Sequence, residues 1–378
     1  MGNRPIADHL LGQEGLIAHF AQLIQADQLP HSLLLAGEEG GEALTLALSI
    51  AQMLLCEHPL QNGSACGQCI DCRQVETLKH PDLTMVFPVI KSGDAKETTS
   101  LLYLDEFSHL LQKTIRLTPM EWRKEQNAGN KQLQIMVAEA ERLIHATSLR
   151  SFKSQHQVIL IWQPELMRID TANKLLKLIE EPPKGVVFLM VSHKPQKLLP
   201  TILSRLQRVT VPHIPEEILI EHLKTKEGLS ESLATSIGHL AQGNLYKALQ
   251  LKETNGEVES LTSALSFLKL PTSRQPKLLL EEAQRIAKLD RPEVLALLNN
   301  IPLLLRELLA LQSGAEEVVF IPSSLMDDCR KLSQQIPLEK IPNIIDELTI
   351  AKQEIMQNAN IQMVIFDILL TFTQLYLK

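Results

Sequence analysis

The sequence predicts an α/β domain with a parallel sheet in its first half and all-α domains in its second half. In the first half, short apolar runs alternate with helical patterns, which is typical of a parallel sheet covered by helices on both faces. After Pro212 no strand-like run follows, and from about residue 260 onward Leu and Ile recur at three- and four-residue spacing. The expected strands are 32–36, 157–162, 186–191 and 208–211, and the expected helices between them are 12–25, 43–55, 135–148 and 171–180.

The chain has 378 residues, which is enough for two or three domains. We expect the α/β domain to cover 1–212, a small helical domain to cover 213–254 and a second helical domain to cover 255–378. The run ETNGE at 253–257 is the expected linker. Residues 89–131 interrupt the alternation with polar stretches around a short apolar helix, so we expect a partly mobile insertion there.

The composition is that of an ordinary globular protein, with 44% hydrophobic and 21% charged residues. A formal net charge of −7 argues against a large basic surface for nucleic acid, and leaves room only for a local basic strip. The start of the chain, MGNRPIADHLLGQEG, has no long apolar core, so no signal peptide is expected. The apolar run 361–372 contains Asp367 and is too short to span a bilayer. The sequence therefore predicts a cytoplasmic protein without a membrane segment.

The segment 31–56 has the frame of a phosphate-binding loop, because a strand-like run is followed by a Gly-rich turn and an apolar helix. A working loop reads G-x-x-x-x-G-K-[ST]. With the template placed at Gly37, the lysine position carries Ala43 and the hydroxyl position carries Leu44. The loop keeps Gly37, Gly40 and Gly41, and it adds negative charge at Glu38, Glu39 and Glu42. We expect the shape of a nucleotide-binding domain without its phosphate chemistry.

Four of the five cysteines lie close together, with the spacing C-x9-C-x2-C-x2-C. Two-residue gaps let paired thiolates reach one zinc ion, and in a cytosolic chain such clustering favours metal over disulfides. An iron–sulfur cluster and unliganded cysteines are the two alternatives. Four thiolates would close the coordination sphere, so the expected zinc is structural. The predicted ligands are Cys56, Cys66, Cys69 and Cys72, whereas Cys329 is expected to be a buried core residue.

Three segments resemble bacterial clamp-loader subunits of the AAA+ family, which are P-loop NTPase-like proteins of DNA polymerase III. They are NKLLKLIEEPPKGVVFLMVSHKPQKLLPTILSRLQRVTV at 173–211, GQEGLIAHFAQLIQADQLPHSLLLAGEEG at 12–40 and HPDLTMVFP at 80–88. A cysteine module directly after the P-loop helix is likewise similar to the gamma/tau and delta prime types, and the delta prime type is the better match. The resemblance covers most of 12–248. Beyond it, helical pattern alone supports the implied lid at 213–254 and the collar at 255–378.

The resemblance also locates the other nucleotide-binding positions. A working loader has Asp-Glu at the end of the strand that precedes Asn173; here Trp162 and Gln163 stand there. Neither side chain replaces a carboxylate that holds magnesium or polarises water. The lid arginine expected in G-x-x-R-x-A-L is Tyr246 in GNLYKAL. These losses together imply that this chain hydrolyses no ATP.

One part of the family's machinery is retained. The sequence ILSRLQ at 202–207 is similar to the family's Ser-Arg-Cys motif, whose arginine reaches the γ-phosphate bound by a neighbouring subunit. Arg205 is therefore the candidate arginine finger, and an ordinary surface salt bridge is the alternative. The nearby EEPP at 180–183 is interpreted as a helix stop signal rather than an acid–base pair.

The resemblance implies a non-hydrolysing subunit that assembles with gamma/tau-type and delta-type subunits into a hetero-pentamer. That assembly would open a sliding clamp and place it on primed DNA. Two other hypotheses remain. One is an ATP-hydrolysing gamma/tau-type subunit, which a nucleotide titration would identify. The other is a zinc-dependent DNA-binding repair protein, for which salt-dependent DNA binding by the isolated chain is the test.

Overall fold

The computed structural model describes residues 4–376, apart from 92–97, 130, 149–150, 254–255, 316–318, 320 and 322. The chain forms two compact units. The first comprises Met1–Leu219 and Gln242–Tyr246, and the second comprises Ile220–Ala241 and Lys247–Lys378. Parts of the predicted insertion (92–97 and 130) and of the predicted linker (254–255) lie outside the described residues.

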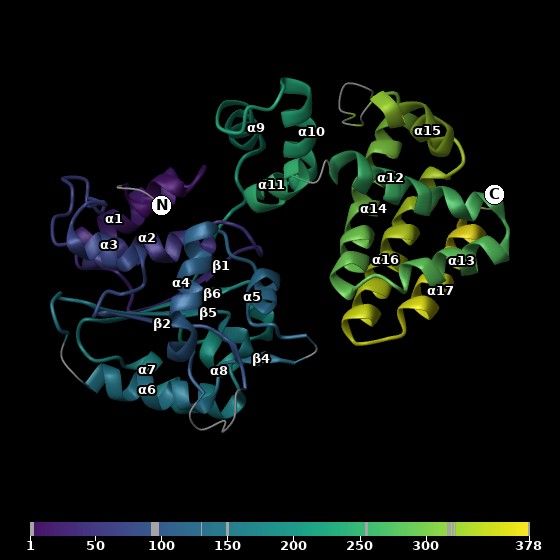
Figure 1. Ribbon diagram of the computed structural model, residues 1–378. Helices are drawn as coiled ribbons and strands as arrows, with labels where there is room; N and C mark the ends of the chain where they lie inside the picture. The colour runs from purple at the N-terminus through teal and green to yellow at the C-terminus, as the bar shows by residue number, and fades with distance from the viewer. Residues whose placement is uncertain are drawn as a thin grey trace. The chain divides into compact units, whose positions relative to one another are not determined.

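The first unit is built on a five-stranded sheet with the strand order β2-β5-β6-β1-β7 (Figure 1). Every neighbouring pair in it is parallel, and Leu34 of β1, for example, lies opposite Met190 of β6. The parallel sheet predicted from the sequence is confirmed. Its strands are β1 (Ser32–Ala36), β2 (Leu83–Val86), β5 (Gln157–Trp162), β6 (Val186–Ser192) and β7 (Gln207–Thr210).

Helices cover both faces of this sheet, because alternate strand residues point to opposite sides. Leu33, Leu35 and Leu160 contribute to one buried cluster with α2, whereas Leu34 and Ile159 contribute to another with α6 and α7. The helices of the first unit are α1 (Glu14–Gln25), α2 (Ala43–Leu55), α3 (Ile70–Glu76), α4 (Leu104–Lys113), α5 (Pro119–Glu125), α6 (Val137–Ser148), α7 (Ile169–Glu180) and α8 (Pro200–Leu203); α9 (Glu216–Thr225) begins in it.

The described part of 89–131 packs into the core of this unit. Phe107 of α4 stacks on Phe87 with 4.0 Å between ring centroids, and Trp122 of α5 contacts both rings edge-on. The Trp122 indole donates a hydrogen bond of 2.7 Å to the Pro88 carbonyl. A short antiparallel pair, β3 (Val89–Ile90) and β4 (Leu133–Gln134), joins the two ends of the segment. These aromatic contacts make α4 and α5 part of the structural core.

The second unit is helical in its described residues and has one main buried cluster. Its longest helix, α14, is long and apolar enough over Glu293–Gln312 to cross a membrane, and it is the one described helix with these properties. Leu298 and Leu305 of α14 are buried in the cluster. The helices of this unit are α10 (Glu231–Ala241), α11 (Leu245–Glu253, from Lys247 on), α12 (Gly256–Lys269), α13 (Pro276–Ile286), α14 (Arg291–Gln312), α15 (Ser323–Ser333), α16 (Ile341–Met356) and α17 (Ile361–Leu375).

Candidate functional site

The Gly-rich loop between β1 and α2 lies where a phosphate-binding loop would be, but its two key positions face the core. Ala43, at the lysine position, is 0% exposed, and Leu44, at the hydroxyl position, is 2% exposed. Gly37 approaches the helix so closely that a Cβ there would come within 2.9 Å of the Ala43 Cβ. These two positions therefore supply neither the ammonium group nor the hydroxyl that a bound triphosphate and its magnesium require.

A buried ion pair lies beside this loop. The Glu42 carboxylate accepts a hydrogen bond of 2.7 Å from Nε of Arg116, which also donates to the His9 carbonyl at 2.5 Å. Burial raises the pKa of Glu42, and the neighbouring Arg116 charge opposes that shift. A polyphosphate would meet a carboxylate here in place of the third loop glycine. Arg116 was not predicted, since its partner lies 74 positions away in the sequence.

The loop is also covered by the chain that follows Gln242. Gly40 has φ +72°, and a Cβ at this position would lie 3.0 Å from the Tyr246 side chain. The Asn244 amide donates to the Glu39 carbonyl at 2.9 Å. Tyr246 thus packs directly on the glycine turn, at the sequence position where the family motif has an arginine. An aromatic ring in this place contributes packing but no positive charge.

Trp162 ends β5 and Gln163 follows it, at the positions where the sequence predicts that Asp-Glu has been replaced. Trp162 is fully buried and packs edge-on against Phe107, with 5.4 Å between ring centroids. Gln163 is 3% exposed and has φ 57°, a left-handed conformation that is uncommon for a residue other than glycine. An indole N–H is a donor only and cannot coordinate magnesium. The amide of Gln163 carries no charge.

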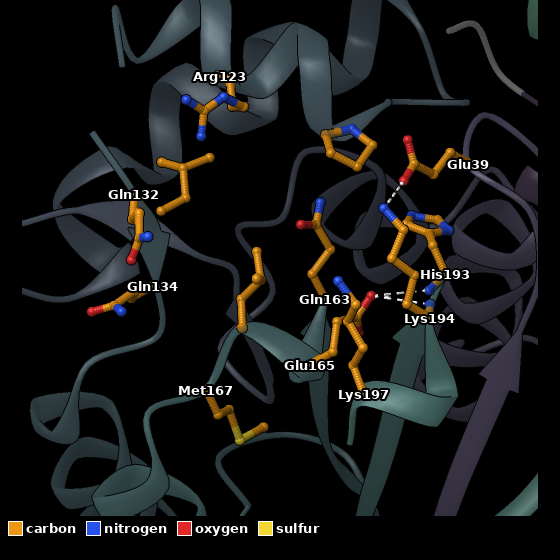
Figure 2. Close-up of a pocket in the computed structure, with 13 residues that line it drawn as sticks. Glu39, Arg123, Gln132, Gln134, Gln163, Glu165, Met167, His193, Lys194 and Lys197 are labelled. Atoms are coloured by element: carbon orange, nitrogen blue, oxygen red, sulfur yellow. Dashed lines mark hydrogen bonds and ion pairs between the residues drawn. The ribbon is translucent and has the colours of Figure 1, made fainter. Parts of the chain in front are cut away.

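A pocket of about 460 Å³ lies beside Gln163 at the carboxyl ends of β5 and β6 (Figure 2). Lys194 reaches Glu39 at 3.0 Å across its wall, and Glu165 accepts hydrogen bonds from the backbone amides of His193 and Lys194 at 3.2 and 3.3 Å. The carboxylates of Glu39 and Glu165 are thus bound by the Lys194 ammonium group and by backbone amides of the same chain. Arg123 on the far wall of the pocket comes from α5.

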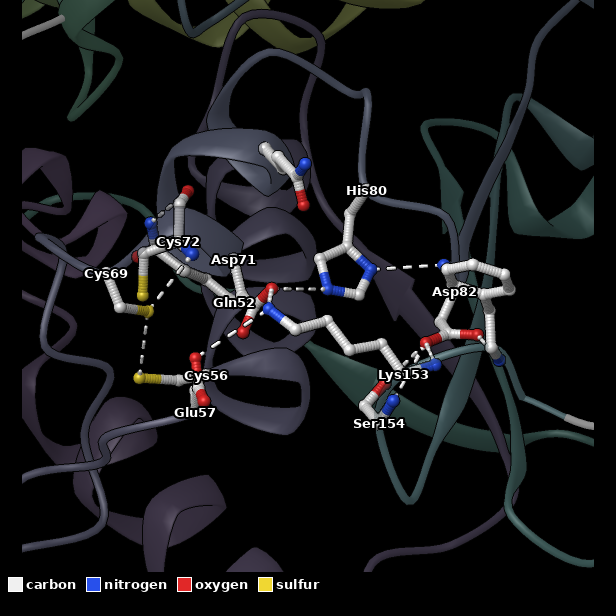
Figure 3. A network of polar contacts seen from close by, with 12 residues as sticks. Gln52, Cys56, Glu57, Cys69, Asp71, Cys72, His80, Asp82, Lys153 and Ser154 are labelled. Carbon is white, nitrogen blue, oxygen red and sulfur yellow. Dashed lines mark hydrogen bonds and ion pairs between the residues drawn. The ribbon is translucent and has the colours of Figure 1, made fainter.

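The four clustered cysteines converge at the end of α2 and the start of α3. Figure 3 shows three of them, Cys56, Cys69 and Cys72. Their Sγ atoms all lie within 4.8 Å of one another. The Sγ of Cys56 is 3.7 Å from that of Cys66 and 4.0 Å from that of Cys69, and Cys66 is 3.9 Å from Cys72. Zinc–thiolate bonds of about 2.3 Å in a tetrahedron place neighbouring sulfurs about 3.8 Å apart. The four residues could hold one metal ion, and their spacing fits zinc.

Local hydrogen bonds favour ionisation of one of these thiols, that of Cys66. Burial opposes ionisation of Cys66, but the amides of Gln68 and Cys69 outweigh it and lower its pKa to about 6. Burial raises the pKa of Cys56 and of Cys72. A metal ion would therefore find one thiolate already formed near neutral pH and would displace protons from its other ligands.

A polar network ties the cysteine module to the rest of the first unit (Figure 3). Asp71 accepts a hydrogen bond of 2.5 Å from Nζ of Lys153, and its other neighbour is Nε2 of His80 at 3.4 Å. Gln52 donates to the Cys72 carbonyl at 3.1 Å. Burial opposes ionisation of Asp82, but hydrogen bonds from the amides of 152–154 prevail and lower its pKa. These hydrogen bonds and ion pairs were not predicted, because isolated polar residues form no recognisable pattern in the sequence.

Arg205 follows α8 and is partly exposed, with 30% of its side chain accessible. Its Nε donates to the Glu180 carboxylate at 2.8 Å, and its Nη1 donates to the Thr201 carbonyl at 2.8 Å. The guanidinium is therefore held in one orientation at the surface. It has an ion-pair partner within this chain, and three of its five N–H groups remain available for an acceptor outside it.

Comparison with known proteins identifies the family. The family model described as DNA polymerase III, delta subunit, matches residues 12–215, which is more than half of the chain. The chain belongs to the DNA polymerase III delta subunit family. The predicted resemblance to clamp-loader subunits of the delta prime type is confirmed. The match ends close to Leu219, where the first compact unit ends its main segment.

Relatives of this DNA polymerase III subunit family extend over most of the chain. The delta prime subunit of Bacillus subtilis is 24% identical over 344 residues, which cover 90% of this chain and 89% of that protein. The tau subunit of Escherichia coli is 25% identical over 370 residues, which cover 92% of this chain and 50% of the tau subunit. A gamma subunit-related protein from Thermotoga maritima covers 94% of this chain with 15% identity and a TM-score of 0.37.

Proposed function

We propose that this chain is a non-hydrolysing, delta prime-like subunit of a DNA polymerase III clamp loader. The observation that carries the proposal is the state of the nucleotide-binding edge, where Ala43 and Leu44 face the core, and Glu42 pairs with Arg116. Such a subunit contributes shape and contacts to the loader, while a neighbour supplies the ATPase. Trp162 and Gln163 at the end of β5 support the same conclusion, because neither residue holds magnesium or activates water.

In this proposal, residues 1–212 form an AAA+ domain, 213–254 form its lid and 255–378 form a collar. The collar holds the chain in a hetero-pentamer with gamma/tau-type and delta-type subunits. The assembly opens a sliding clamp and places it on primed DNA during replication in the cytoplasm, with no attachment to a membrane. The helical second unit, whose core includes α14 and α17, supports an assembly role for the C-terminal part.

Arg205 is the residue by which this subunit would act on its neighbour's chemistry. A guanidinium placed beside a γ-phosphate stabilises the negative charge that develops on the phosphoryl oxygens during transfer. Its planar fork suits these oxygens better than the point charge of a lysine. Partial exposure and the remaining N–H groups of Arg205 support this role.

Zinc is the metal that we propose for the four cysteines. Four thiolates leave no open coordination position, so the ion would stabilise the fold around α3 rather than take part in a reaction. The residues that would hold it are Cys56, Cys66, Cys69 and Cys72. The network of Asp71, Lys153 and Gln52 would then fix the loaded module against the unit.

Reconstitution tests this proposal. The chain would be mixed with partner gamma/tau-type and delta-type subunits, and loading of a fluorescent clamp onto primed DNA would be followed with and without it. We expect clamp loading to require the chain, and we expect the chain alone to bind no ATP in a titration. Tight ATP binding by the isolated chain would favour the gamma/tau-type hypothesis, to which the similarity with tau subunits also points. Salt-dependent DNA binding by the isolated chain, without a role in loading, would favour the zinc-dependent repair protein.

A further inference from the structure

We propose that Glu180 is the positioning residue for Arg205, an inference that rests on the proposed function. The two residues lie 25 positions apart, one at the end of α7 and one directly after α8. Nε of Arg205 donates to Oε2 of Glu180 at 2.8 Å, while Nη1 donates to the Thr201 carbonyl, also at 2.8 Å. Two acceptors on different segments therefore define both the position and the plane of the guanidinium.

The location of Glu180 requires an explanation that helix stability does not provide. It is the last residue of α7, where the unsatisfied carbonyls give the helix end a partial negative charge. A carboxylate at this end is electrostatically unfavourable, and cations are the residues that stabilise it. An exposed ion pair adds little to stability, and here 53% of the Glu180 side chain is accessible. The geometric effect on Arg205 is therefore the main consequence of this contact.

The pairing leaves Arg205 able to act in trans. A guanidinium has five N–H donors, and Glu180 and Thr201 use two of them. The three that remain include both N–H groups of Nη2, which makes no hydrogen bond in the described structure. A free arginine side chain populates many rotamers, and fixing one of them costs conformational entropy. Because the contact with Glu180 orders the Arg205 side chain before assembly, this entropy is not lost when the guanidinium binds the phosphate of a neighbour.

The reaction served is ATP hydrolysis in the neighbouring subunit. The γ-phosphorus gains a bond to the oxygen of water and loses its bond to the β–γ bridging oxygen. ADP leaves with that electron pair, and the proton of the water is released with inorganic phosphate. Arg205 takes no part in bond making, because it stays protonated and stabilises charge on the phosphoryl oxygens. Glu180 acts through Arg205 alone.

The test compares reconstituted loaders that contain the wild-type chain, Glu180→Ala, Glu180→Gln, Arg205→Ala or the double variant Glu180→Ala/Arg205→Ala. The matched control is Glu181→Ala, because the adjacent Glu181 is exposed and its side chain has no ion pair in the described structure. Pre-steady-state ATP hydrolysis is measured in loaders whose other ATP sites are inactivated, so that the early phase reports the site that faces this subunit. We expect Glu180→Ala to slow that phase about tenfold, by analogy with the partners that orient metal ligands, whose loss costs about tenfold or more in activity. The rate of Glu180→Gln should lie between the rates of Glu180→Ala and the wild type, because glutamine keeps the acceptor oxygen and loses the charge.

The double variant decides whether Glu180 acts through Arg205. We expect it to hydrolyse ATP at the rate of Arg205→Ala alone; additive slowing would overturn the inference. A normal rate for Glu180→Ala beside a slow Arg205→Ala would overturn the inference and leave the proposed function intact. A normal rate for Arg205→Ala would contradict the finger role and the inference with it. In the isolated chain, the Nε–H signal of Arg205 in ¹⁵N spectra should exchange faster with water in Glu180→Ala than in Glu181→Ala, and equal exchange would refute the contact.

Discussion

Glu42 and Arg116 form a buried ion pair, with 2.7 Å between Oε1 and Nε, at the position where a phosphate-binding loop needs its third glycine. The pair joins the start of α2 to the segment between α4 and α5. Only 1% of the Glu42 side chain and 11% of the Arg116 side chain are accessible. The ion pair therefore holds two segments of the same chain together.

Removal of Arg116 should destabilise the protein strongly. Arg116→Ala leaves the buried Glu42 carboxylate without its charged partner, and such losses cost about 3 kcal/mol. We expect Glu42→Gln/Arg116→Ala to recover part of that loss, because the uncompensated charge is then absent. Urea unfolding curves of the two variants and the wild type give the free energies of unfolding that test this prediction. A double variant less stable than Arg116→Ala would contradict the prediction.

The penalty of Arg116→Ala should also depend on pH. Burial already raises the pKa of Glu42 above its usual value, and loss of the arginine charge raises it further. The folded state then binds a proton that the unfolded state has released, so stability falls as pH rises from the ordinary carboxyl pKa of 4.5 through the raised value. We expect a smaller difference from the wild type at pH 5 than at pH 8. A difference that is equal at both pH values would show that Glu42 does not carry the effect.

Restoring the consensus loop residues should not restore nucleotide binding. Ala43→Lys/Leu44→Thr places an ammonium group at a position that is 0% exposed, beside a loop already occupied by Glu42 and Tyr246. We expect a loss of about 2–3 kcal/mol in stability and no binding of ATP in a fluorescence titration. Gln22→Lys, at an exposed position of α1, is the matched control and should be close to neutral. Micromolar ATP binding by the double variant would contradict this account of the loop.

The cysteine cluster should bind one zinc ion per chain. Cys69→Ser removes one thiolate and also the Sγ that caps α3 by accepting from the Cys72 amide. Metal content and the thermal midpoint should therefore fall together, since structural zinc is coupled to folding. Cys329→Ala is the control, because Cys329 is buried in the second unit and should leave the metal content unchanged. Full zinc occupancy in Cys69→Ser would exclude the four-thiolate site.

Much of the sheet was predictable from local pattern. β1 and β5 coincide with the expected strands 32–36 and 157–162, because each is an apolar run bounded by polar or turn residues. β2, at Leu83–Val86, was not among the expected strands. The place of Phe107 and Trp122 in the core was also not predictable. Their contacts with Phe87 link positions that only the folded chain brings together.

The residues of the candidate site were likewise predictable only in part. The cysteine spacing alone predicted a cluster, because its ligands lie within 17 positions, from Cys56 to Cys72. The positions of the nucleotide-binding motifs were assigned by motif register, and the loss of their function stays a prediction. Glu180 was interpreted only as part of a helix stop, and nothing local in the sequence pairs it with Arg205. Such pairs depend on how α7 and α8 pack against each other. The periodicity of a single sequence predicts helices but not their packing partners.

We propose that this chain acts on a neighbour's ATP through Arg205 and has no ATPase of its own. The direct measurement is DNA- and clamp-stimulated ATP hydrolysis by loaders that contain wild-type, Arg205→Ala or Arg205→Lys subunit, with assembly verified by size-exclusion chromatography. We expect Arg205→Ala to slow ATP hydrolysis at the adjoining site on the order of 10³-fold. Arg205→Lys should restore little of that rate, because an ammonium group lacks the planar fork of a guanidinium. Equal rates in all three assembled loaders would contradict the claim.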